Sequence, residues 1–276
     1  MLPHACHQAL RRTPGDDPAM GSSSNVVLGP GLAVAAVLAV VVATLVATWV
    51  RLGTARLTVI AAVRAVAQLA AVSLLIGAIV GSVWLSALFV LLMIVVAAYT
   101  AARRMTPDPS GWWSALPIAL APLPVTALLV LGGVVPAQGI AVIPMAGILI
   151  GGTMTATALG GRRALDELEA RHGEYEAALS LGFLERDARM EIARPSAGQA
   201  LVPPIDQTRT VGLVTLPGAF VGMLLGGASP IEAGAVQVLV LLLLLAVETV
   251  AVATMLELVC RGRVRRPARR AVPVRN

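Results

Sequence analysis

The chain has 276 residues, of which 57% are hydrophobic and 13% are charged, and its mean hydropathy is +0.84. A water-soluble domain of this length needs more charged residues to cover its surface, so the composition favours a polytopic helical membrane protein. All 21 basic residues are arginine. Without lysine, the chain carries neither a Walker-type nucleotide site nor a lysine Schiff base.

The first 25 residues are polar and contain Gly, Ser and Pro without apolar periodicity. Such a segment cannot bury enough apolar surface to fold, so we expect residues 1–25 to be a disordered tail. No short apolar core with a cleavage site follows Arg11 and Arg12, so a signal peptide is not expected. Met20 is a second candidate for the start of translation.

Seven apolar stretches follow, and each is long enough to cross a bilayer or nearly so. We therefore expect an all-α, polytopic integral membrane protein with a membrane domain over residues 26–259. The predicted spans are Val26–Val50, Leu57–Val80, Val83–Ala102, Trp112–Val134, Ile140–Leu159, Val211–Gly227 and Ile231–Val259.

Arginine is distributed unevenly between these spans. The connections after the first, third and fifth spans and the segment after the seventh carry it, whereas the other three connections have none. Cytoplasmic connections are the basic ones, so we expect the N-terminus outside and the C-terminus in the cytoplasm of a plasma-membrane protein. Residues 160–210 are then the longest cytoplasmic segment. Residues 260–276 form a basic cytoplasmic tail, which anchors the topology or contacts anionic lipid.

Several other functions are excluded by what the sequence lacks. Cys6 and Cys260 lie near opposite ends of the chain and on opposite predicted faces, so no disulfide is expected. The predicted spans contain neither His nor Cys, and scattered methionines are more often packing residues than metal ligands. No HExxH or GxSxG motif occurs, and no basic stripe with interleaved aromatic residues. We expect no catalytic site, no cofactor on this chain and no nucleic-acid partner.

The longest loop has helical periodicity. One apolar stripe between Gly161 and Gly182 predicts an amphipathic helix over that range; its members are Leu165, Leu168, His172, Tyr175 and Leu179. Gly182 ends or breaks this helix. A second helix, Phe183–Ala193, is predicted to stop before Pro195.

The same loop resembles the EAA loop of ABC-transporter permeases. The residues that carry the resemblance are Glu176, Ala177, Ala178, Gly182, Ile192 and Pro195. Arg194 departs from the pattern, which usually has Leu there. The resemblance implies a coupling helix within the 162–195 loop that seats in a separate ATPase subunit. The alternative is an amphipathic helix lying on the inner membrane surface.

The rest of the chain, from about residue 30 to 260, resembles the FetB-type permeases, a family linked to iron export and, in plants, to aluminium tolerance. The strongest block runs from Pro204 to Gln237 and includes Pro204-Ile205-Asp206, Thr208, Val211-Gly212-Leu213-Val214, Leu216-Pro217-Gly218, Gly222, Ser229-Pro230, Ala233 and Gln237. Arg64, Gln68-Leu69, Ile143-Pro144, Gly147 and Gly151 fit as well. Departures occur at Gly152 and Thr155, where the family usually has asparagines, and at Ala219 and Phe220, where it usually has Met. These departures indicate that the substrate here differs if the family's side chains touch it.

Several membrane residues are candidates for the translocation path. Pro217-Gly218 predicts a kink or break in the sixth span, either as a hinge or as ordinary packing. Two groups of glycines predict close helix approach within one subunit or at a dimer interface: positions 147, 151 and 152, and positions 218, 222, 226 and 227. Arg64 and Glu248 are charged residues inside spans, so we expect them to pair or to line the cavity.

These observations favour one reading over two others. We expect the permease subunit of an ATP-driven transporter, a homodimer in lipid that works with two copies of a separate ATPase subunit and exports iron or another metal ion. The alternative is a secondary transporter or channel without ATP, which would predict inverted repeats or more intramembrane charges. An intramembrane enzyme is not expected.

Overall fold

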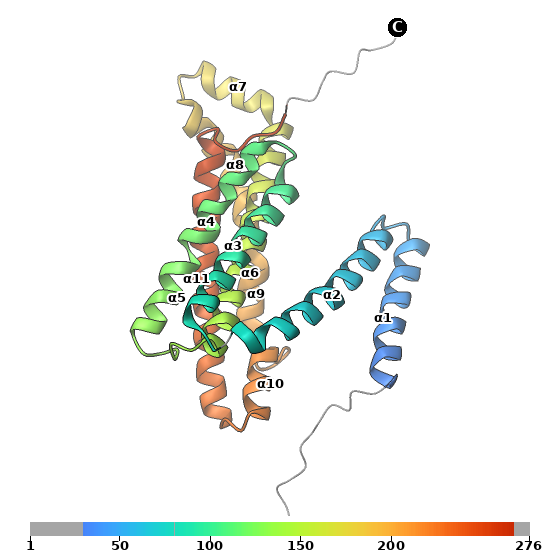
Figure 1. Ribbon diagram of the computed structural model, residues 1–276. Helices are drawn as coiled ribbons and strands as arrows, with labels where there is room; N and C mark the ends of the chain where they lie inside the picture. The colour runs from blue at the N-terminus through green and yellow to red at the C-terminus, as the bar shows by residue number, and fades with distance from the viewer. Residues whose placement is uncertain (1–29, 80, 268–276) are drawn as a thin grey trace, which may run out of the picture. The chain divides into compact units, whose positions relative to one another are not determined.

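The computed structural model describes residues 30–79 and 81–267 and is built from helices in this part of the chain (Figure 1). The chain divides into two units, residues 1–68 and 69–276, and each is described by itself.

The first unit contains α1 (Pro30–Trp49) and most of α2 (Ala55–Ile79). A tight turn joins them, with left-handed backbone at Arg51 (φ 56°) and Gly53 (φ 72°). Nearly all residues of α1 and of the first part of α2 are exposed, although α1 is apolar on every face and α2 is apolar apart from a few residues such as Arg56, Arg64 and Gln68. A helix that is apolar on every face, as α1 is, suits lipid or the interior of a membrane bundle.

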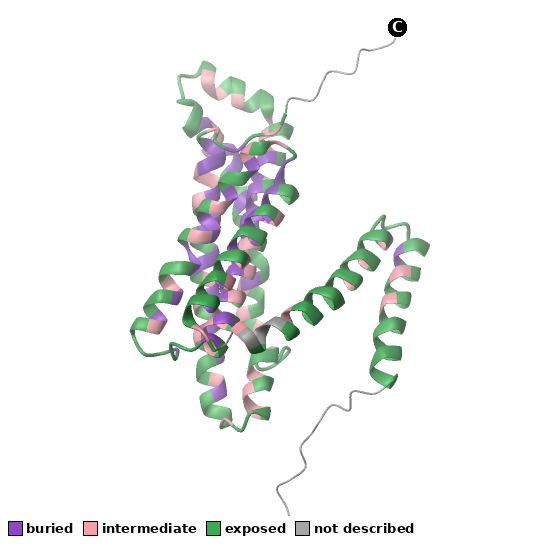
Figure 2. Cartoon of the chain, viewed as in Figure 1, coloured by how far each residue is buried: buried purple, intermediate pink, exposed green. Residues whose placement is uncertain are grey.

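The core of the second unit consists of three long helices, α3 (Val83–Met105), α6 (Gly139–Ala170) and α11 (Pro230–Cys260). Buried residues concentrate where these three helices and the segment after α6 pack together (Figure 2). Their cluster includes Val90, Ala98, Ile150, Met255 and Leu258. This apolar core holds the ends of the three helices in fixed relation.

Glycines on α6 allow the close packing against both neighbours. A methyl group added at Gly147 would lie 3.0 Å from the Met93 Cε atom of α3, and one at Gly161 would meet Met105. On the side of α11, Gly160 faces Val252 and Gly161 also faces Met255. Residue numbers rise together along each pair of helices, so α3, α6 and α11 run parallel. Small residues at helix contacts let backbones approach in this way.

The chain returns between α3 and α6 through three short helical segments. They are η1 (Pro109–Ser114), α4 (Ala115–Leu120) and α5 (Pro122–Leu131). The Ser114 hydroxyl donates a hydrogen bond to the Ala98 carbonyl of α3 at 3.1 Å, which closes the hairpin. The predicted fourth span is therefore interrupted, because Pro122 lacks the N–H that would continue α4.

The return between α6 and α11 is also interrupted. It consists of α9 (Val202–Thr210), an irregular stretch over 211–217, and α10 (Gly218–Leu225). The prediction of one helical span over Val211–Gly227 is therefore wrong. Gly212 has a φ of +84° and Pro217 caps α10 with extended backbone, so neither residue can continue a helix. The expected break at Pro217-Gly218 is confirmed.

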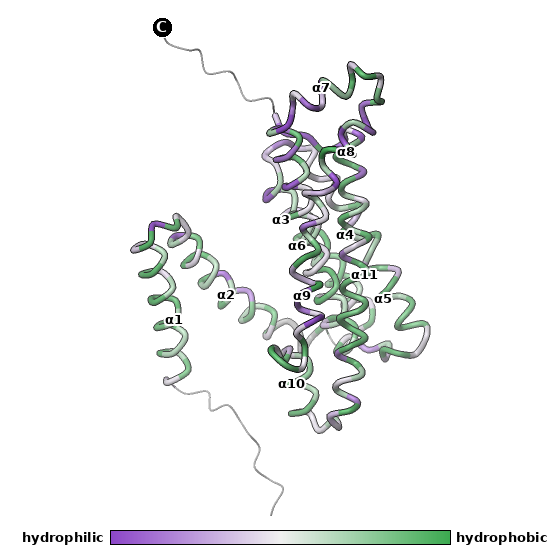
Figure 3. The backbone as a smooth tube through the Cα atoms, turned by 180° about the vertical axis from the view of Figure 1, so that it is seen from behind, coloured by the Kyte–Doolittle hydropathy of each residue, from purple (hydrophilic) through white to green (hydrophobic). Residues whose placement is uncertain are grey.

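Six segments in the described part of the chain are long and apolar enough to cross a membrane. They are Pro30–Trp49, Ala55–Leu74, Val83–Met105, Pro109–Leu131, Gly139–Ala170 and Pro230–Cys260. Polar colour gathers at the end of the second unit where α7 and α8 lie (Figure 3). We call this region the α7–α8 end.

The predicted loop helices differ from those observed. Instead of one helix over Gly161–Gly182, α6 continues to Ala170 and a bend at Arg171 begins α7 (His172–Ser180). The second helix, α8 (Glu185–Gly198), does not stop before Pro195 but includes it, and η2 (Gln199–Leu201) follows. Pro195 removes one hydrogen bond near the end of α8, and the buried residues Ile192, Ala193 and Ala197 hold that turn against the core.

Candidate functional site

The resemblance to the EAA loop falls on α7, α8 and the turn between them. Glu176, Ala177 and Ala178 lie on α7, a helix without buried residues, and Ile192 and Pro195 lie on α8. Ile192 is buried in the core, whereas Pro195 is exposed. We call Glu176–Pro195 the EAA segment. It combines an exposed helix with a helix anchored to the rest of the unit.

Gly182 forms the turn that joins the two helices. Its φ of +91° is in the left-handed region, which favours glycine. The Gly182 N–H donates to the Leu179 carbonyl at 2.9 Å, and the Phe183 N–H donates to the Ala178 carbonyl at 3.1 Å. This pair of bonds is the Schellman arrangement that ends a helix. The spacing from Ala178 to Gly182 therefore has a structural reason.

Charged contacts fix α7 at its start and across to α8. The Arg171 Nε atom donates to Glu174 at 2.7 Å, and this contact holds the pKa of Glu174 below its ordinary value. A carboxylate with a lowered pKa contributes stability above its unfolded pKa and loses it as the pH falls, so this contact persists at neutral pH. The Arg189 guanidinium donates to the Tyr175 hydroxyl at 3.2 Å and lies 5.4 Å from the centre of its ring. Glu176 lies 3.3 Å from the His172 Nε2 atom.

A bidentate ion pair joins α8 to α11. Arg186 donates to the two carboxylate oxygens of Glu257 at 2.8 and 2.7 Å, and these bonds raise the pKa of Arg186 above its ordinary value. Two-point contacts of this kind fix orientation as well as distance. The position of the EAA segment is therefore linked to that of α11.

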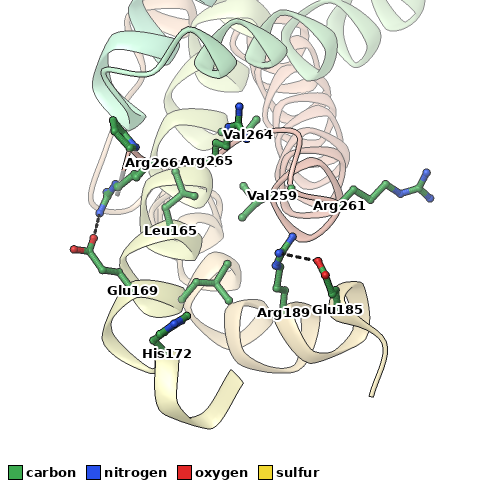
Figure 4. A pocket seen from close by; sticks show the side chains of 13 residues that line it. Leu165, Glu169, His172, Glu185, Arg189, Val259, Arg261, Val264, Arg265 and Arg266 are labelled. Carbon is green, nitrogen blue, oxygen red and sulfur yellow. Dashed lines mark hydrogen bonds and ion pairs between the residues drawn. The ribbon is translucent and has the colours of Figure 1, made fainter. Parts of the chain in front are cut away.

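A groove of about 790 Å³ lies beside the EAA segment (Figure 4). Figure 4 shows His172 and Arg189 on one side and the segment after α11 on the other. The charged residues of its lining are four arginines and two glutamates, and most of the others are apolar. The lining residues are Leu165, Leu168, Glu169, His172, Glu185, Arg189, Val259, Arg261, Gly262, Val264, Arg265, Arg266 and Pro267. Arg189 pairs with Glu185 at 3.0 Å, and Arg266 pairs with Glu169 at 3.2 Å.

The segment after α11 closes this end of the unit. Val264 is buried, and the Arg265 carbonyl accepts a hydrogen bond from the Thr106 hydroxyl at 3.0 Å. Arg266 also pairs with Asp166 of α6 at 2.6 Å. The first residues of the predicted basic tail are thus packed against α3 and α6. The rest of that tail, after residue 267, and the predicted disordered tail, 1–25, lie outside the described residues.

A second candidate site lies between α9 and the two helices, α6 and α11, that contain the predicted fifth and seventh spans. It is a cavity of about 320 Å³, which we call the Glu248 cavity. Its lining residues are Ile148, Gly151, Gly152, Thr155, Ala156, Leu159, Ala200, Pro203, Pro204, Gln207, Leu244 and Glu248. Thr155 and Gln207 are exposed, so the cavity is open on one side of the second unit.

Glu248 is the one charged residue in this lining, and it is 6% exposed. Among the described residues, no hydrogen bond or ion pair reaches its carboxylate. A methyl group added at Gly152 would lie 2.4 Å from the Glu248 Oε1 atom, so glycine at this position leaves room for the carboxylate. Gly152 and Thr155, the two departures from the family pattern in the fifth span, thus lie in the same cavity as Glu248.

The structure brings only some of the predicted membrane residues together. Gly151 and Glu248 line the cavity, whereas Gly147 packs against α3 and Pro144 lies exposed earlier in α6. Asp206 is exposed on α9, 3.9 Å from Arg209. Pro217, Gly218 and Gly222 belong to α10 and its cap. Gln237 is buried in α11, and its Oε1 atom has no hydrogen-bond partner among the described residues.

Arg64 and Gln68 are exposed on α2 in the first unit, and Glu248 belongs to the second. A pair between Arg64 and Glu248 therefore stays a prediction.

Sequence reasoning missed Gln207 and the cavity face of α9. Ala200, Pro204 and Gln207 are spaced by four and three residues, which places them on one face of a helical segment. That spacing was available in the sequence. It was obscured because residues up to 210 were assigned to a polar loop.

Residues 31–263 match the model of an uncharacterised protein family, UPF0014. In rice, the UPF0014 membrane protein STAR2 is 40% identical over 161 residues, which are 58% of this chain and 56% of the relative. In Arabidopsis thaliana, the protein ALUMINUM SENSITIVE 3 is 38% identical over 161 residues, or 58% of this chain and 59% of the relative.

In Escherichia coli K12, the probable iron export permease protein FetB is 35% identical over 123 residues, or 43% of this chain and 46% of the relative. The chain thus spans about half the length of the curated relatives it matches. No solved structure matches it.

Proposed function

Because the chain belongs to the UPF0014 family of membrane proteins, we propose that it is the permease subunit of an ATP-driven transporter. The ATPase is a separate subunit that binds the EAA segment. The chain itself is a multi-pass membrane protein, and its relatives are named as membrane proteins and a permease. Two copies of the chain form the membrane part of the transporter.

The observation that carries this proposal is the structure of the EAA segment. α7 has no buried residue, so it is free to enter a cleft of a partner. α8 is anchored through Ala188, Ile192 and Ala193 and through the Arg186–Glu257 ion pair. An exposed helix on an anchored support can pass a displacement of the partner to the core helices. A helix lying on the membrane would instead favour basic residues on its polar face, whereas α7 carries Glu174 and Glu176.

The parallel arrangement of α3, α6 and α11 supports seven crossings. A chain that runs along α6 and then along α11 in the same direction must return between them. The α9–α10 pair supplies this return as a broken helix, as η1, α4 and α5 do between α3 and α6. The positive-inside rule then assigns the α7–α8 end to the cytoplasm and the N-terminus to the outside.

The cargo we propose is a metal ion moved out of the cytoplasm. Support comes from the names of relatives, one of which is a probable iron export permease and another ALUMINUM SENSITIVE 3. The Glu248 cavity supplies an oxygen-lined place for such an ion between the predicted spans.

Exposed polar residues and uncovered glycines in the second unit support a homodimer. Thr155 and Gln207 lie at the open side of the Glu248 cavity, and polar groups are costly when they face lipid. A methyl group added at Gly218 or Gly222 of α10 would meet nothing within 4 Å. A second copy of the chain that packs against these surfaces would shield the polar groups from lipid and fill the space beside the α10 glycines.

The second candidate function is a secondary transporter that works without ATP. The buried, unpaired carboxylate of Glu248 favours it, because intramembrane carboxylates serve ion coupling in such proteins. This candidate predicts transport in the absence of any ATPase subunit.

The test is co-purification of the tagged chain with stand-alone ATPase subunits expressed from the same genome, followed by measurement of ATP hydrolysis. The wild-type chain should retain the ATPase and stimulate it. Gly182→Ala should reduce both, because a left-handed residue with a Cβ costs roughly 1–2 kcal/mol and shifts the turn between α7 and α8. Glu176→Arg should do the same by reversing a charge on exposed α7.

Gly173→Ala is the matched control. Gly173 lies within α7 outside the EAA segment, its φ is not positive, and an added methyl group would meet nothing within 4 Å. This variant should hold the ATPase as the wild-type chain does. Equal retention by Gly182→Ala and Glu176→Arg would contradict docking at the EAA segment, and transport by vesicles that contain only this chain would favour the second candidate.

A further inference from the structure

The carboxylate of Glu248 is the starting point, because burial of an unpaired charge needs a reason. Glu248 is 6% exposed and contacts the Glu248 cavity, and no other charged residue lines that cavity. An ionisable group at membrane depth costs several kcal/mol unless it is paired or hydrated. Within the second unit no described residue pairs with it, so a cation that enters the cavity can supply the counter-charge.

The lining restricts what that ligand is. It contains no arginine, so it does not attract an anion, and no aromatic ring, which organic ammonium ions use for cation–π contacts. It contains no Cys, Met or His, so it lacks the sulfur and imidazole ligands that soft and intermediate metals prefer. Oxygen is the ligand atom that remains.

Three side chains of the lining supply oxygen. They are the carboxylate of Glu248, the hydroxyl of Thr155 and the amide carbonyl of Gln207, from three different helices. The Thr155 hydroxyl donates its proton to the Gly151 carbonyl at 3.1 Å, so its lone pairs remain available. Carboxylate, hydroxyl and carbonyl oxygens are ligands for hard cations.

The volume fits an ion with part of its water shell. The cavity measures about 320 Å³, and one water takes about 30 Å³ in the liquid. Hard divalent ions such as Mg²⁺ commonly keep several waters and use one or two carboxylates. The described residues contain no group of three His, Cys, Asp or Glu side chains that could hold a metal ion. A site with one carboxylate binds weakly enough to release its ion, as transport requires.

We propose that the Glu248 cavity is a transit site for a hard, oxygen-seeking and partly hydrated metal cation, with Glu248, Thr155 and Gln207 as its protein ligands. The proposal rests on the proposed function, since it names the cargo class and the residues that hold it. Gly152 belongs to the site by exclusion, because any side chain there would displace the Glu248 carboxylate.

The test is equilibrium binding of Mn²⁺ to the purified full-length chain in detergent, followed by electron paramagnetic resonance. Mn²⁺ is the probe because it is a hard cation with a direct signal for the free ion. The wild-type chain should bind it saturably. Glu248→Gln should weaken binding by at least about tenfold, the loss typical for groups that support a metal site.

Glu232→Gln is the matched control, since it makes the same change at the exposed start of the same helix, where Gln can replace Glu in the capping box with Ser229. It should bind Mn²⁺ as the wild-type chain does. A second variant and its control keep the test usable if Glu248→Gln does not fold. Thr155→Val removes a hydroxyl from the cavity, and Thr249→Val removes one that is exposed on α11 and bonded to the Leu245 carbonyl. Only the first of these should weaken binding.

Two results would overturn the site: no saturable Mn²⁺ binding by the wild-type chain, or equal binding by Glu248→Gln. Because Mn²⁺ binding is measured without the ATPase, this failure is separable from failure of the proposed function. Co-purification of the ATPase with Glu248→Gln would leave the permease role standing when the site falls.

Discussion

Gly152 is the position at which α6 passes closest to the buried carboxylate on α11. An added Cβ atom would lie 2.4 Å from the Glu248 Oε1 atom and 2.4 Å from the Leu244 Cδ1 atom. Gly151 beside it has nothing within 4 Å of an added Cβ atom. Two adjacent glycines thus differ in their reason for being small. One prevents a collision, and the other borders open space.

We therefore expect Gly152→Ala to lower the melting temperature of the purified chain and Gly151→Ala to leave it nearly unchanged. Overpacking of this kind typically costs about 1–3 kcal/mol. Thermal unfolding in detergent, followed by tryptophan fluorescence, measures both. The double variant Gly152→Ala with Glu248→Ala should be less destabilised than the sum of the single changes, because one of the two collisions of the added methyl group is with the removed side chain. Additive effects would contradict the contact.

At this scale the sequence identified Glu248 but not its surroundings. A single acid in an apolar run is visible without a structure, because its burial cost does not depend on its neighbours. Gly152 and Thr155 lie on α6 and Gln207 lies on α9, and only the packing of α6, α9 and α11 brings them to Glu248. Gly182 was visible for the opposite reason, since a helix end with a left-handed glycine is a local feature.

Among the elements, α8 follows the exposed helix α7 and is joined to α11 by one bidentate ion pair in addition to its buried residues. Arg186 and Glu257 meet at 2.8 and 2.7 Å across α8 and α11, and their side chains are 47% and 28% exposed. Water screens such a pair, so its contribution to the stability of the chain is small. Its effect is therefore on the mobility of the EAA segment more than on the stability of the whole chain.

Arg186→Ala should accordingly increase hydrogen exchange of residues 172–198 while the rest of the second unit keeps its protection. Hydrogen–deuterium exchange with peptide mapping measures this difference. Arg162→Ala is the control, because Arg162 lies 3.8 Å from Asp166 on the same helix and joins no two elements. Equal exchange in the two variants would show that the ion pair does not hold α8.

Local rules predicted where helices break more reliably than where they continue. The break at Pro217-Gly218 was predicted, because proline and glycine act on the backbone within one turn. The continuation of α8 through Pro195 was not, because buried Ile192, Ala193 and Ala197 stabilise that turn from the core side. The bend at Arg171 interrupts an unbroken apolar stripe, so the stripe alone could not reveal it.

For the whole molecule, the parallel course of α3, α6 and α11 leads to a prediction about sidedness. If α9 and α10 return the chain across the membrane as proposed, the connection after α10 lies on the opposite membrane face from the α7–α8 end. In a chain whose two native cysteines are replaced, Ala228→Cys and Ala137→Cys should react with an impermeant maleimide in intact cells. Ser180→Cys should react only after the cells are opened.

The control is Ser180→Cys in opened cells, which establishes that the position is reactive; it lies exposed at the end of α7. Labelling of Ser180→Cys in intact cells would reverse the orientation. If both Ala228→Cys and Ser180→Cys were labelled only in opened cells, the two positions would lie on the same membrane face. That result would contradict a crossing by α9 and α10.

The all-helical class and the membrane character were predictable from composition, because apolar runs of this length have few other solutions. The long helices were predictable for the same reason. The number of crossings was harder, because α9 carries Asp206, Gln207 and Arg209 and does not resemble a membrane segment. The proposal that α9 belongs to a crossing rests only on the direction of the helices on either side.

That shared direction has an electrostatic consequence. Each long helix carries a macrodipole equivalent to about half a negative charge at its C-terminal end, and in α3, α6 and α11 these ends all lie at one face. Arginine stands at each of them: Arg103 and Arg104 in the last turn of α3, Arg171 directly after α6 and Arg261 directly after α11. The arginines that we expect to orient the chain in the bilayer thus also neutralise three helix termini. A change of any one of them to a neutral residue weakens both effects together.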